Sequence, residues 1–427
     1  MRSKNIKPVK MLSGDISVPG DKSISHRAIM CGAVSEGKTI ARGILDCDDC
    51  NYTIRAFQDM GVRVERKERN TEIYGVGLDG LTDPGKPINT GSSGTSMRVL
   101  SGILAGQDFT STLTGDEGLL KRPMKRIIEP LELMGAHMAS APGGLPPIRI
   151  TPGEIKAIDY TLPVPSAQVK SAILFAGLFA SGRTTVTEKI KSRDHTERMM
   201  KYFGADAQAD GLKVSVNGPA RMSAKELEVP GDISSASFLL CGAILLNGSK
   251  VRIKNVSVNP TRTGILSIMS RMGAYVRAVN RTDSFEPYGD IEAVSAPVNG
   301  IEINEGEIPG IIDELPIIFV LAALANGRTV ISGAGELRIK ETDRITSMKE
   351  NLDKMGGRMS VEGGRIVIEG VKKLKGAELK SYGDHRTCMA MTIAALCADG
   401  ASTMDDVECV NKSFPGFFEI LDSITAR

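Results

Sequence analysis

Basic side chains stand at the start of a predicted helix, the end at which a helix dipole favours anions. Lys22, His26 and Arg27 follow a Pro-Gly turn in VPGDKSISHRAIM. Free backbone N–H groups point outward at such an end, so added bases do not serve stability on their own. A bound anion would complete the site, because N–H groups, hydroxyls and arginines together bind phosphate or carboxylate.

Charged and small polar residues also gather at the start of other predicted helices and in the segments that follow them. They are Ser92, Ser93, Gly94, Thr95 and Arg98 with Lys121 and Arg122; Ser166, Gln168 and Lys170 with Ser192, Arg193 and His195; Asp313 and Glu314 with Lys340, Glu341 and Arg344; and Asp384, His385 and Arg386 with Lys412. One such cluster is typical of a solvated surface, but the recurrence favours a site for several anionic groups, which we expect to be two phosphates and carboxylates.

His26 and His195 are expected to be structural, whereas His385 is a candidate for ligand contact.

These segments do not match the common nucleotide-binding motifs. GSSGTS lacks the Gly-Lys-Ser/Thr of a P-loop, and no G-x-G-x-x-G follows a predicted strand. The expected anion site is therefore not a P-loop or a dinucleotide fold.

Repeated elements must position these residues. A helical pattern ends in Met or an aromatic residue followed by glycine at Gly61, Gly135, Gly204, Gly273 and Gly356. Glycine after the last turn is the expected C-terminal cap. A second element recurs six times along the chain: a polar turn, a helix of small and apolar residues, a glycine and a β-branched strand.

The two helices of each repeat differ in character. The first is apolar on nearly all faces, which indicates burial, and the second is amphipathic, which indicates an outer position. Each repeat then has the order strand, buried helix, strand, outer helix, strand, strand. The sequence predicts an α/β protein with repeats one to three in one half and repeats four to six in the other.

Two similar junctions, VPGDKSIS at 18 and VPGDISSA at 229, indicate where the chain crosses between the halves. We expect one domain of residues 20–230, and a second of residues 1–19 and 231–427. The buried helices are expected to direct their N-termini at the cleft between the domains, a natural ligand site.

Composition excludes several classes of partner. The net charge is +2, the chain has no Trp, and aromatic residues make up 4%, which disfavours nucleic acid and an anionic membrane surface. The N-terminus lacks an apolar signal core, so we expect a cytoplasmic protein.

Among seven cysteines, Cys47 and Cys50 form CDDC, but a zinc site would need a second ligand pair. We expect reduced thiols and no metal.

Nine segments together resemble the 5-enolpyruvylshikimate-3-phosphate synthase family over essentially the whole chain. They are GDKSISHRA, SSGTSMR, KRPM, SAQVKSA, SRDHTERM, IDELP, LRIKETDR, GDHR and KSFPGF. The resemblance implies two pseudo-threefold halves, each of three βαβαββ units (an inverse α/β barrel). It also implies transfer of the enolpyruvyl group of phosphoenolpyruvate to the 5-hydroxyl of shikimate 3-phosphate, with release of phosphate. We expect a monomer that acts on these small molecules without a metal or organic cofactor.

The resemblance also implies roles for individual residues. Asp313 is the candidate base for the 5-hydroxyl, and Glu341 and Lys22 are candidates for proton transfer at carbon. The implied shikimate 3-phosphate contacts are Lys22, Ser23, Arg27, Ser166, Ala167, Gln168, Ser192, Asp313 and Lys340. The implied phosphoenolpyruvate contacts are Lys22, Gly94, Arg122, Gln168, Arg344, Arg386 and Lys412. Further candidates are Thr95, Arg98 and His385.

Two alternatives stay open at this point. The sister enzyme that uses UDP-N-acetylglucosamine has a Lys-Asn pair and a cysteine-bearing loop, where this chain has Lys22-Ser23 and GDEGLLKRP. A non-catalytic ligand-binding scaffold is disfavoured, because Asp313 and Glu341 accompany the cations. Ala167, His195 and Glu336 depart from part of the family, which affects the expected details of substrate contact.

Overall fold

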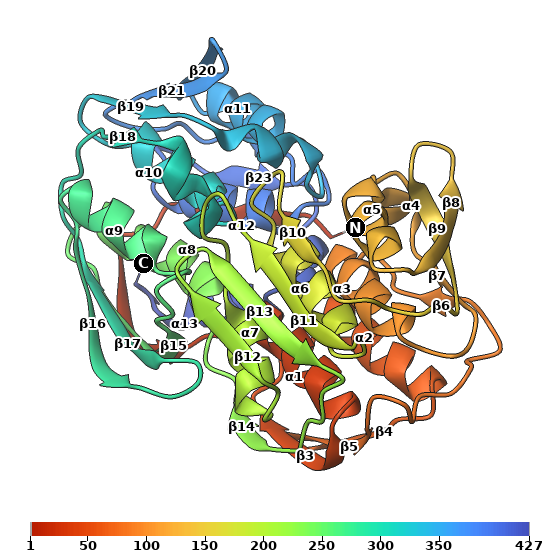
Figure 1. Cartoon of the computed structure of the whole chain (residues 1–427). Helices are drawn as coiled ribbons and strands as arrows, with labels where there is room; N and C mark the ends of the chain where they lie inside the picture. The colour runs from red at the N-terminus through yellow and green to blue at the C-terminus, as the bar shows by residue number, and fades with distance from the viewer. Residues whose placement is uncertain (1, 427) are drawn as a thin grey trace. The chain divides into compact units, whose positions relative to one another are not determined.

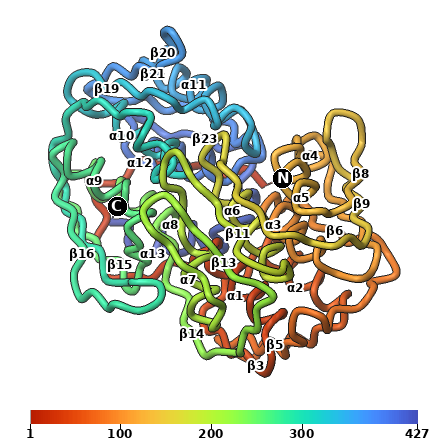
Figure 2. The backbone as a smooth tube through the Cα atoms, viewed as in Figure 1, coloured from red at the N-terminus to blue at the C-terminus, as the bar shows by residue number. Residues whose placement is uncertain are grey.

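The computed structural model describes residues 2–426, and the chain divides into two compact units (Figures 1 and 2). Unit 2 is continuous and runs from Gly20 to Val229. Unit 1 combines the residues up to Pro19 with those from Pro230 onward. No helix within residues 2–426 has the length and apolar character needed to cross a membrane.

The strands of residues 20–229 form three four-stranded sheets with one shared order. In each sheet, taken in spatial order, the first strand is parallel to the second, and the third pairs antiparallel with both the second and the fourth. The sheets are β14 (Glu226–Glu228), β3 (Glu36–Arg42), β5 (Asn70–Val76), β4 (Arg63–Lys67); β6 (Ile88–Asn89), β7 (Ser111–Thr114), β9 (Leu145–Thr151), β8 (His137–Ala141); and β10 (Asp159–Thr161), β11 (Gly182–Thr187), β13 (Lys213–Gly218), β12 (Ala207–Asp210).

Unit 2 closes on itself through β14. This strand lies at the end of the unit in sequence, yet it pairs in parallel with β3 and so takes the place of the first strand in the first sheet. The first repeat therefore draws one strand from the far end of its unit.

The helices of unit 2 separate into buried and outer sets. The buried helices are α1 (Lys22–Ala33), α3 (Gly94–Ala105) and α6 (Ala167–Gly177), and the outer helices are α2 (Asp48–Asp59), the short α4 (Glu117–Leu120), α5 (Lys125–Leu133) and α7 (His195–Tyr202). Helices α3 and α6 pack closely against each other at Gly102. A Cβ at this position would lie 2.1 Å from the backbone oxygen of Ala172, so the contact requires glycine. Small residues thus allow these buried helices to approach each other.

Unit 1 repeats this plan with an incomplete third sheet, as traced over residues 2–19 and 230–426. Its sheets are β16 (Tyr275–Thr282), β17 (Tyr288–Val294), β15 (Lys250–Ser257), β2 (Met11–Ser17), β24 (Thr425–Ala426); β18 (Glu302–Ile303), β19 (Arg328–Ile331), β21 (Arg365–Glu369), β20 (Arg358–Glu362); and β1 (Lys4–Ile6), β23 (Ser402–Met404), β22 (Glu378–Leu379). In the third sheet β22 is parallel to β23, and β1 pairs antiparallel with β23, in the place that β21 has beside β19 in the second sheet.

The buried helices of unit 1 pack against one another and form the centre of its hydrophobic core. They are α8 (Ile233–Leu245), α10 (Leu315–Ala323) and α12 (His385–Leu396), and the outer elements are α9 (Gly264–Arg271), α11 (Arg344–Lys354), α13 (Phe417–Ser423) and the 3-10 turns η1 (Glu305–Gly310), η2 (Ala334–Ile339) and η3 (Glu408–Lys412). Every residue of α10 and α12 is buried. The all-round apolar pattern therefore predicts these positions correctly.

The repeating α/β fold expected from the sequence is confirmed, with its buried and outer helices in the expected order. The repeated glycines also behave as expected. Their φ angles run from +79° at Gly356 to +102° at Gly135, in the left-handed region that ends a helix.

Candidate active site

In unit 2, Lys22 is the first residue of α1 and faces a carboxylate. Its Nζ lies 3.0 Å from Oδ2 of Asp49, and the hydroxyl of Ser92 donates to Oδ1 of Asp49 at 3.3 Å. Asp21 caps α1 by accepting from the N–H of Ile24. The Lys22 side chain is 17% exposed, so its ammonium is fixed by Asp49 and still meets solvent. Asp49 could not be predicted from the sequence, because it stands inside CDDC, where the two cysteines are the candidate ligands.

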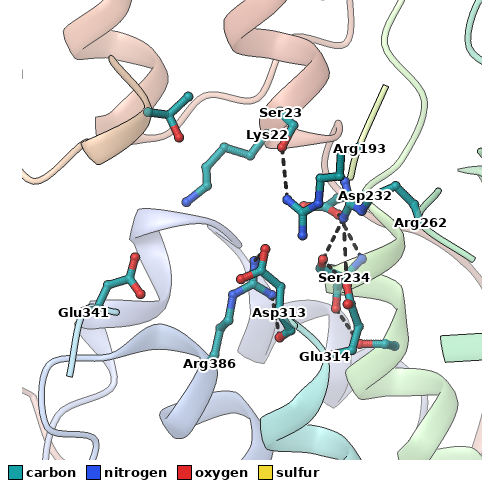
Figure 3. Close-up of polar contacts among 12 residues, drawn as sticks. Lys22, Ser23, Arg193, Asp232, Ser234, Arg262, Asp313, Glu314, Glu341 and Arg386 are labelled. Carbon is teal, nitrogen blue, oxygen red and sulfur yellow. Dashed lines mark hydrogen bonds and ion pairs between the residues drawn. The ribbon is translucent and has the colours of Figure 1, made fainter. Parts of the chain in front are cut away.

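Arg27 points from α1 into a set of hydroxyl groups. Its Nε donates to Oγ1 of Thr196 at 3.0 Å, and its Nη2 donates to Oγ of Ser171 at 3.0 Å. Burial, then the nearby Arg193, lowers the pKa of Arg27 to about 10, which leaves the guanidinium charged at neutral pH. Arg193 also donates to the Ser23 hydroxyl at 3.4 Å, as Figure 3 shows. Ser23, Arg27 and Arg193 therefore lie close together.

Gly94, the first residue of α3, lies beside two guanidinium groups. A Cβ at this position would lie 2.6 Å from Nη1 of Arg98 and 3.5 Å from Nη1 of Arg122. Arg98 Nη1 donates to Oε1 of Gln168 at 3.0 Å, and Gln168 Nε2 donates to Oγ1 of Thr95 at 3.0 Å. Two cations beside a helix N-terminus make an arrangement suited to an anion.

The start of α6 carries the next candidates. Ser166 caps the helix by accepting from the N–H of Val169 at 3.4 Å, and Ala167 is the first helical residue. Ser192 is buried, and its N–H donates to Oε1 of Glu188 at 3.1 Å. Lys170 is fully buried and bonded to carboxylates, so it belongs to the interior and not to the open helix ends.

In unit 1, Arg344 joins three carboxylates from different segments. Its Nε donates to Asp384 at 2.8 Å and its Nη1 to Asp313 at 3.4 Å, while its Nη2 donates to Glu341. We call these four residues the Arg344 cluster. Burial would lower the pKa of Arg344, but Asp384, then Glu341 and Asp313, raise it well above the usual range. Arg344 lies on the buried face of α11 and is therefore a fixed positive charge.

Asp313 has a second guanidinium partner. Arg386 Nη2 lies 3.4 Å from its Oδ2, and Arg386 Nη1 donates to its backbone oxygen at 3.0 Å (Figure 3). Asp384 caps α12 by accepting from the N–H of Arg386, and Lys412 Nζ donates to the backbone oxygen of Gly383 at 3.0 Å. The structure thus gathers Asp313, Arg386 and Lys412 around the start of α12.

Arg262 belongs to a buried group next to Asp313 that the sequence does not predict. Arg262 Nη2 donates to Asp232 at 3.1 Å and to the Ser234 hydroxyl at 2.7 Å, and it lies 3.9 Å from Glu314, as drawn in Figure 3. Glu314 is the N-terminal cap of α10 and is fully buried. Arg262 balances these carboxylates, but its segment carries no repeated motif that would have identified it.

The histidines lie in the interior. His26 is fully buried, its Nδ1 bonds the Thr53 hydroxyl at 2.8 Å, and burial lowers its pKa to about 3. His195 and His385 are the first residues of α7 and α12, and both are buried. Lys340 follows η2 and is half-buried, beside Glu341 in the chain.

Cys47 and Cys50 stand at the start of α2 and are both buried. A hydrogen bond between the thiols lowers the pKa of Cys47, while burial raises that of Cys50. Residues 2–426 hold no group of three or more His, Cys, Asp or Glu side chains placed to bind a metal ion.

Comparison with known proteins gives one consistent result. The family model described as EPSP synthase (3-phosphoshikimate 1-carboxyvinyltransferase) matches residues 6–421. A 3-phosphoshikimate 1-carboxyvinyltransferase of Desulforamulus reducens is 47% identical over 422 residues, 98% of each chain. One of Geobacter metallireducens is 46% identical over 429 residues, 100% of each chain. The solved EPSP synthase of Acinetobacter baumannii superposes with a TM-score of 0.89 at 43% identity, covering 100% of this chain and 98% of that chain.

Proposed function

Because the chain belongs to the EPSP synthase (3-phosphoshikimate 1-carboxyvinyltransferase) family, we propose that it transfers the enolpyruvyl group of phosphoenolpyruvate to the 5-hydroxyl of shikimate 3-phosphate. Inorganic phosphate is the second product. The observation that carries the proposal is the Arg344 cluster, which holds two candidate acid–base carboxylates, Asp313 and Glu341, on one buried guanidinium.

The reaction is an addition followed by an elimination. A proton adds to the methylene carbon of phosphoenolpyruvate, and C2 gains oxocarbenium character. The 5-hydroxyl oxygen then bonds to C2 and gives up its proton. In the second stage the new methyl group loses a proton, the C2–phosphate oxygen bond breaks, and the double bond forms again. The protein must therefore supply acid–base groups and cations around the departing phosphate.

Asp313 is the proposed base for the 5-hydroxyl. Each of its carboxylate oxygens lies 3.4 Å from a guanidinium, one from Arg344 and the other from Arg386. These two contacts fix the carboxylate plane. An ionised carboxylate has about four acceptor positions, so it can still take the proton of a bound hydroxyl.

Glu341 and Lys22 are proposed to move the proton at carbon. Glu341 is partly exposed and is oriented by Arg344, while Lys22 is oriented by Asp49. Both side chains are thus held in place, as a group that transfers a proton to a bound substrate requires.

The remaining candidates are assigned to substrate binding in this proposal. For phosphoenolpyruvate they are Lys22, Gly94, Arg122, Gln168, Arg344, Arg386 and Lys412. For shikimate 3-phosphate they are Lys22, Ser23, Arg27, Ser166, Ala167, Gln168, Ser192, Asp313 and Lys340. Support comes from Gly94 beside the Arg98 and Arg122 guanidiniums, and from the hydroxyl groups that orient Arg27. The cytoplasmic location and the monomeric state stay predictions.

A two-acceptor assay tests the function. Phosphate release from phosphoenolpyruvate is measured with shikimate 3-phosphate and, separately, with UDP-N-acetylglucosamine. We expect release only with shikimate 3-phosphate. Release only with the nucleotide sugar would establish the sister activity, and no release with either acceptor would favour a non-catalytic protein.

Substitutions test the proposed catalytic residues. Lys22→Ala, Asp313→Ala and Glu341→Ala should each lower kcat about 100-fold or more, with unchanged circular dichroism, because a positioned acid or base contributes at least that factor. Lys349→Ala and Asp353→Ala are matched controls, since these residues form an exposed ion pair on α11. Wild-type turnover in the first three variants would contradict the assignment.

A further inference from the structure

A buried ion cluster lies behind Ser192 in unit 2. Lys170 Nζ lies 2.9 Å from Oε2 of Glu188 and 2.8 Å from Oε1 of Glu197. The side chains of Lys170 and Glu188 are 0% exposed, and that of Glu197 is 4% exposed. Burial works to lower the pKa of Lys170, but the two carboxylates outweigh it and raise the pKa, so the ammonium stays charged.

The two carboxylates differ in what they reach beyond Lys170. The second oxygen of Glu188, Oε1, accepts from both the N–H and the hydroxyl of Ser192. The second oxygen of Glu197, Oε2, has no hydrogen-bond partner within residues 2–426. Of these two carboxylates, Glu188 is the one that connects the buried ammonium to the loop that carries Ser192.

Stability alone does not account for this cluster. Buried ion pairs often contribute little to stability, because removing the charges from water costs about as much as their attraction returns. A carboxylate directly behind a serine that binds phosphate would also repel that phosphate. Lys170 offsets the repulsion, so the carboxylate can remain there and hold the loop.

We propose that Glu188, held in place by Lys170, is a positioning residue that fixes Ser192 to receive the phosphate of shikimate 3-phosphate. The inference rests on the proposed function, in which Ser192 contacts that substrate. The N–H of Ser192 stays on Glu188 and anchors the backbone. The hydroxyl proton, which points to Glu188 in this structure, turns to a phosphate oxygen when the substrate binds.

Two isosteric substitutions separate this role from a purely structural one. In Glu188→Gln the amide NH2 must face either the ammonium of Lys170 or the N–H of Ser192, and both are donors. In Glu197→Gln the NH2 can take the place of Oε2, and the amide oxygen can keep its bond to Lys170. Both variants remove one buried negative charge beside the same lysine, but only Glu188→Gln disturbs Ser192.

Steady-state kinetics with each substrate give the readout. We expect Glu188→Gln to raise the KM for shikimate 3-phosphate about tenfold, the effect of losing one or two hydrogen bonds at a binding group. The KM for phosphoenolpyruvate should stay within about threefold, and Glu197→Gln should leave both KM values within about threefold. Equal KM values for shikimate 3-phosphate in the two variants would overturn the proposal.

A double-variant cycle adds a second criterion. In a Ser192→Ala background, Glu188→Gln should raise the KM for shikimate 3-phosphate by less than in the wild type, because the hydroxyl on which it acts is gone. Fully additive effects would count against positioning. If the wild type itself shows no phosphate release with shikimate 3-phosphate, the proposed function fails, and this result is distinct from failure of the present inference.

A further variant keeps the test available if Glu188→Gln does not fold. In Lys170→Met/Glu188→Gln no ammonium opposes the amide, so the Gln oxygen can turn to Ser192 and the NH2 away from it. The KM for shikimate 3-phosphate should then lie within about threefold of the Glu197→Gln value. A KM as high as that of Ser192→Ala would refute the proposal.

Discussion

His26 makes the stability of unit 2 depend on pH in a way that can be calculated. It is fully buried on α1, and its Nδ1 bonds Thr53. Burial is the main cause that lowers its pKa to about 3, while Asp49 raises the pKa and Lys22 and Arg27 lower it. The imidazole is therefore neutral in the folded protein throughout the range in which an unfolded histidine takes up a proton.

The direction and size of the effect follow from linkage. An unfolded histidine has a pKa of about 6.5, so between about pH 3 and pH 6.5 the unfolded chain binds more protons than the folded one. The stabilisation is complete above pH 6.5 and is lost as the pH falls, by up to about 1.36 kcal/mol per pH unit. From pH 7 to pH 5 this amounts to about 2 kcal/mol.

Urea unfolding at pH 7 and pH 5 measures this loss. The His26→Gln variant retains a hydrogen-bonding side chain but has no group that titrates in this range. We expect the free energy of unfolding to fall by about 2 kcal/mol more in the wild type than in His26→Gln between the two pH values. His137→Gln, at an exposed position, should behave like the wild type. An equal pH dependence in wild type and His26→Gln would refute the reasoning.

Two further substitutions test the substrate-binding groups. Gly94→Ala should raise the KM for phosphoenolpyruvate about tenfold with little change in stability, because the new methyl group displaces the flexible end of Arg98. Gly306→Ala is the control, because a Cβ there meets nothing within 4 Å, and the same KM for phosphoenolpyruvate in both variants would contradict the assignment. Thr196→Val removes the hydroxyl that accepts from Arg27 and should raise the KM for shikimate 3-phosphate about tenfold, with recovery in Thr196→Ser; an unchanged KM in Thr196→Val would show that Arg27 needs no such support.

The repeats and their helices could be predicted because each carries a periodic signal over many residues. The apolar helices, the glycine caps and the order of elements were all visible in the sequence. The pairing partners of β14 and β1 could not be predicted, because these strands are three residues long and pair with strands far away in sequence. Such short segments have too few positions to show a period of two.

The candidate site could be predicted where a motif carries the residue, and not where its partner comes from another element. Lys22 and Arg344 stand in segments that resemble a known family, whereas Asp49 and Arg262 are recognised only from their contacts. Lys170 was predicted as a site residue but lies in the interior. Its place near a helix start suggested an open cation, but packing turns it inward to Glu188 and Glu197.

The pairing of β1 with β23 has a consequence for how the chain is made. Lys4 lies opposite Met404 in the antiparallel register, so β1 leaves the ribosome about 400 residues before its partner strand does. Every strand of unit 2 is available as soon as Glu228 has emerged. During synthesis the inserted unit can therefore mature first, while the leading segment stays unpaired, exposed to proteases and chaperones until the last repeat arrives.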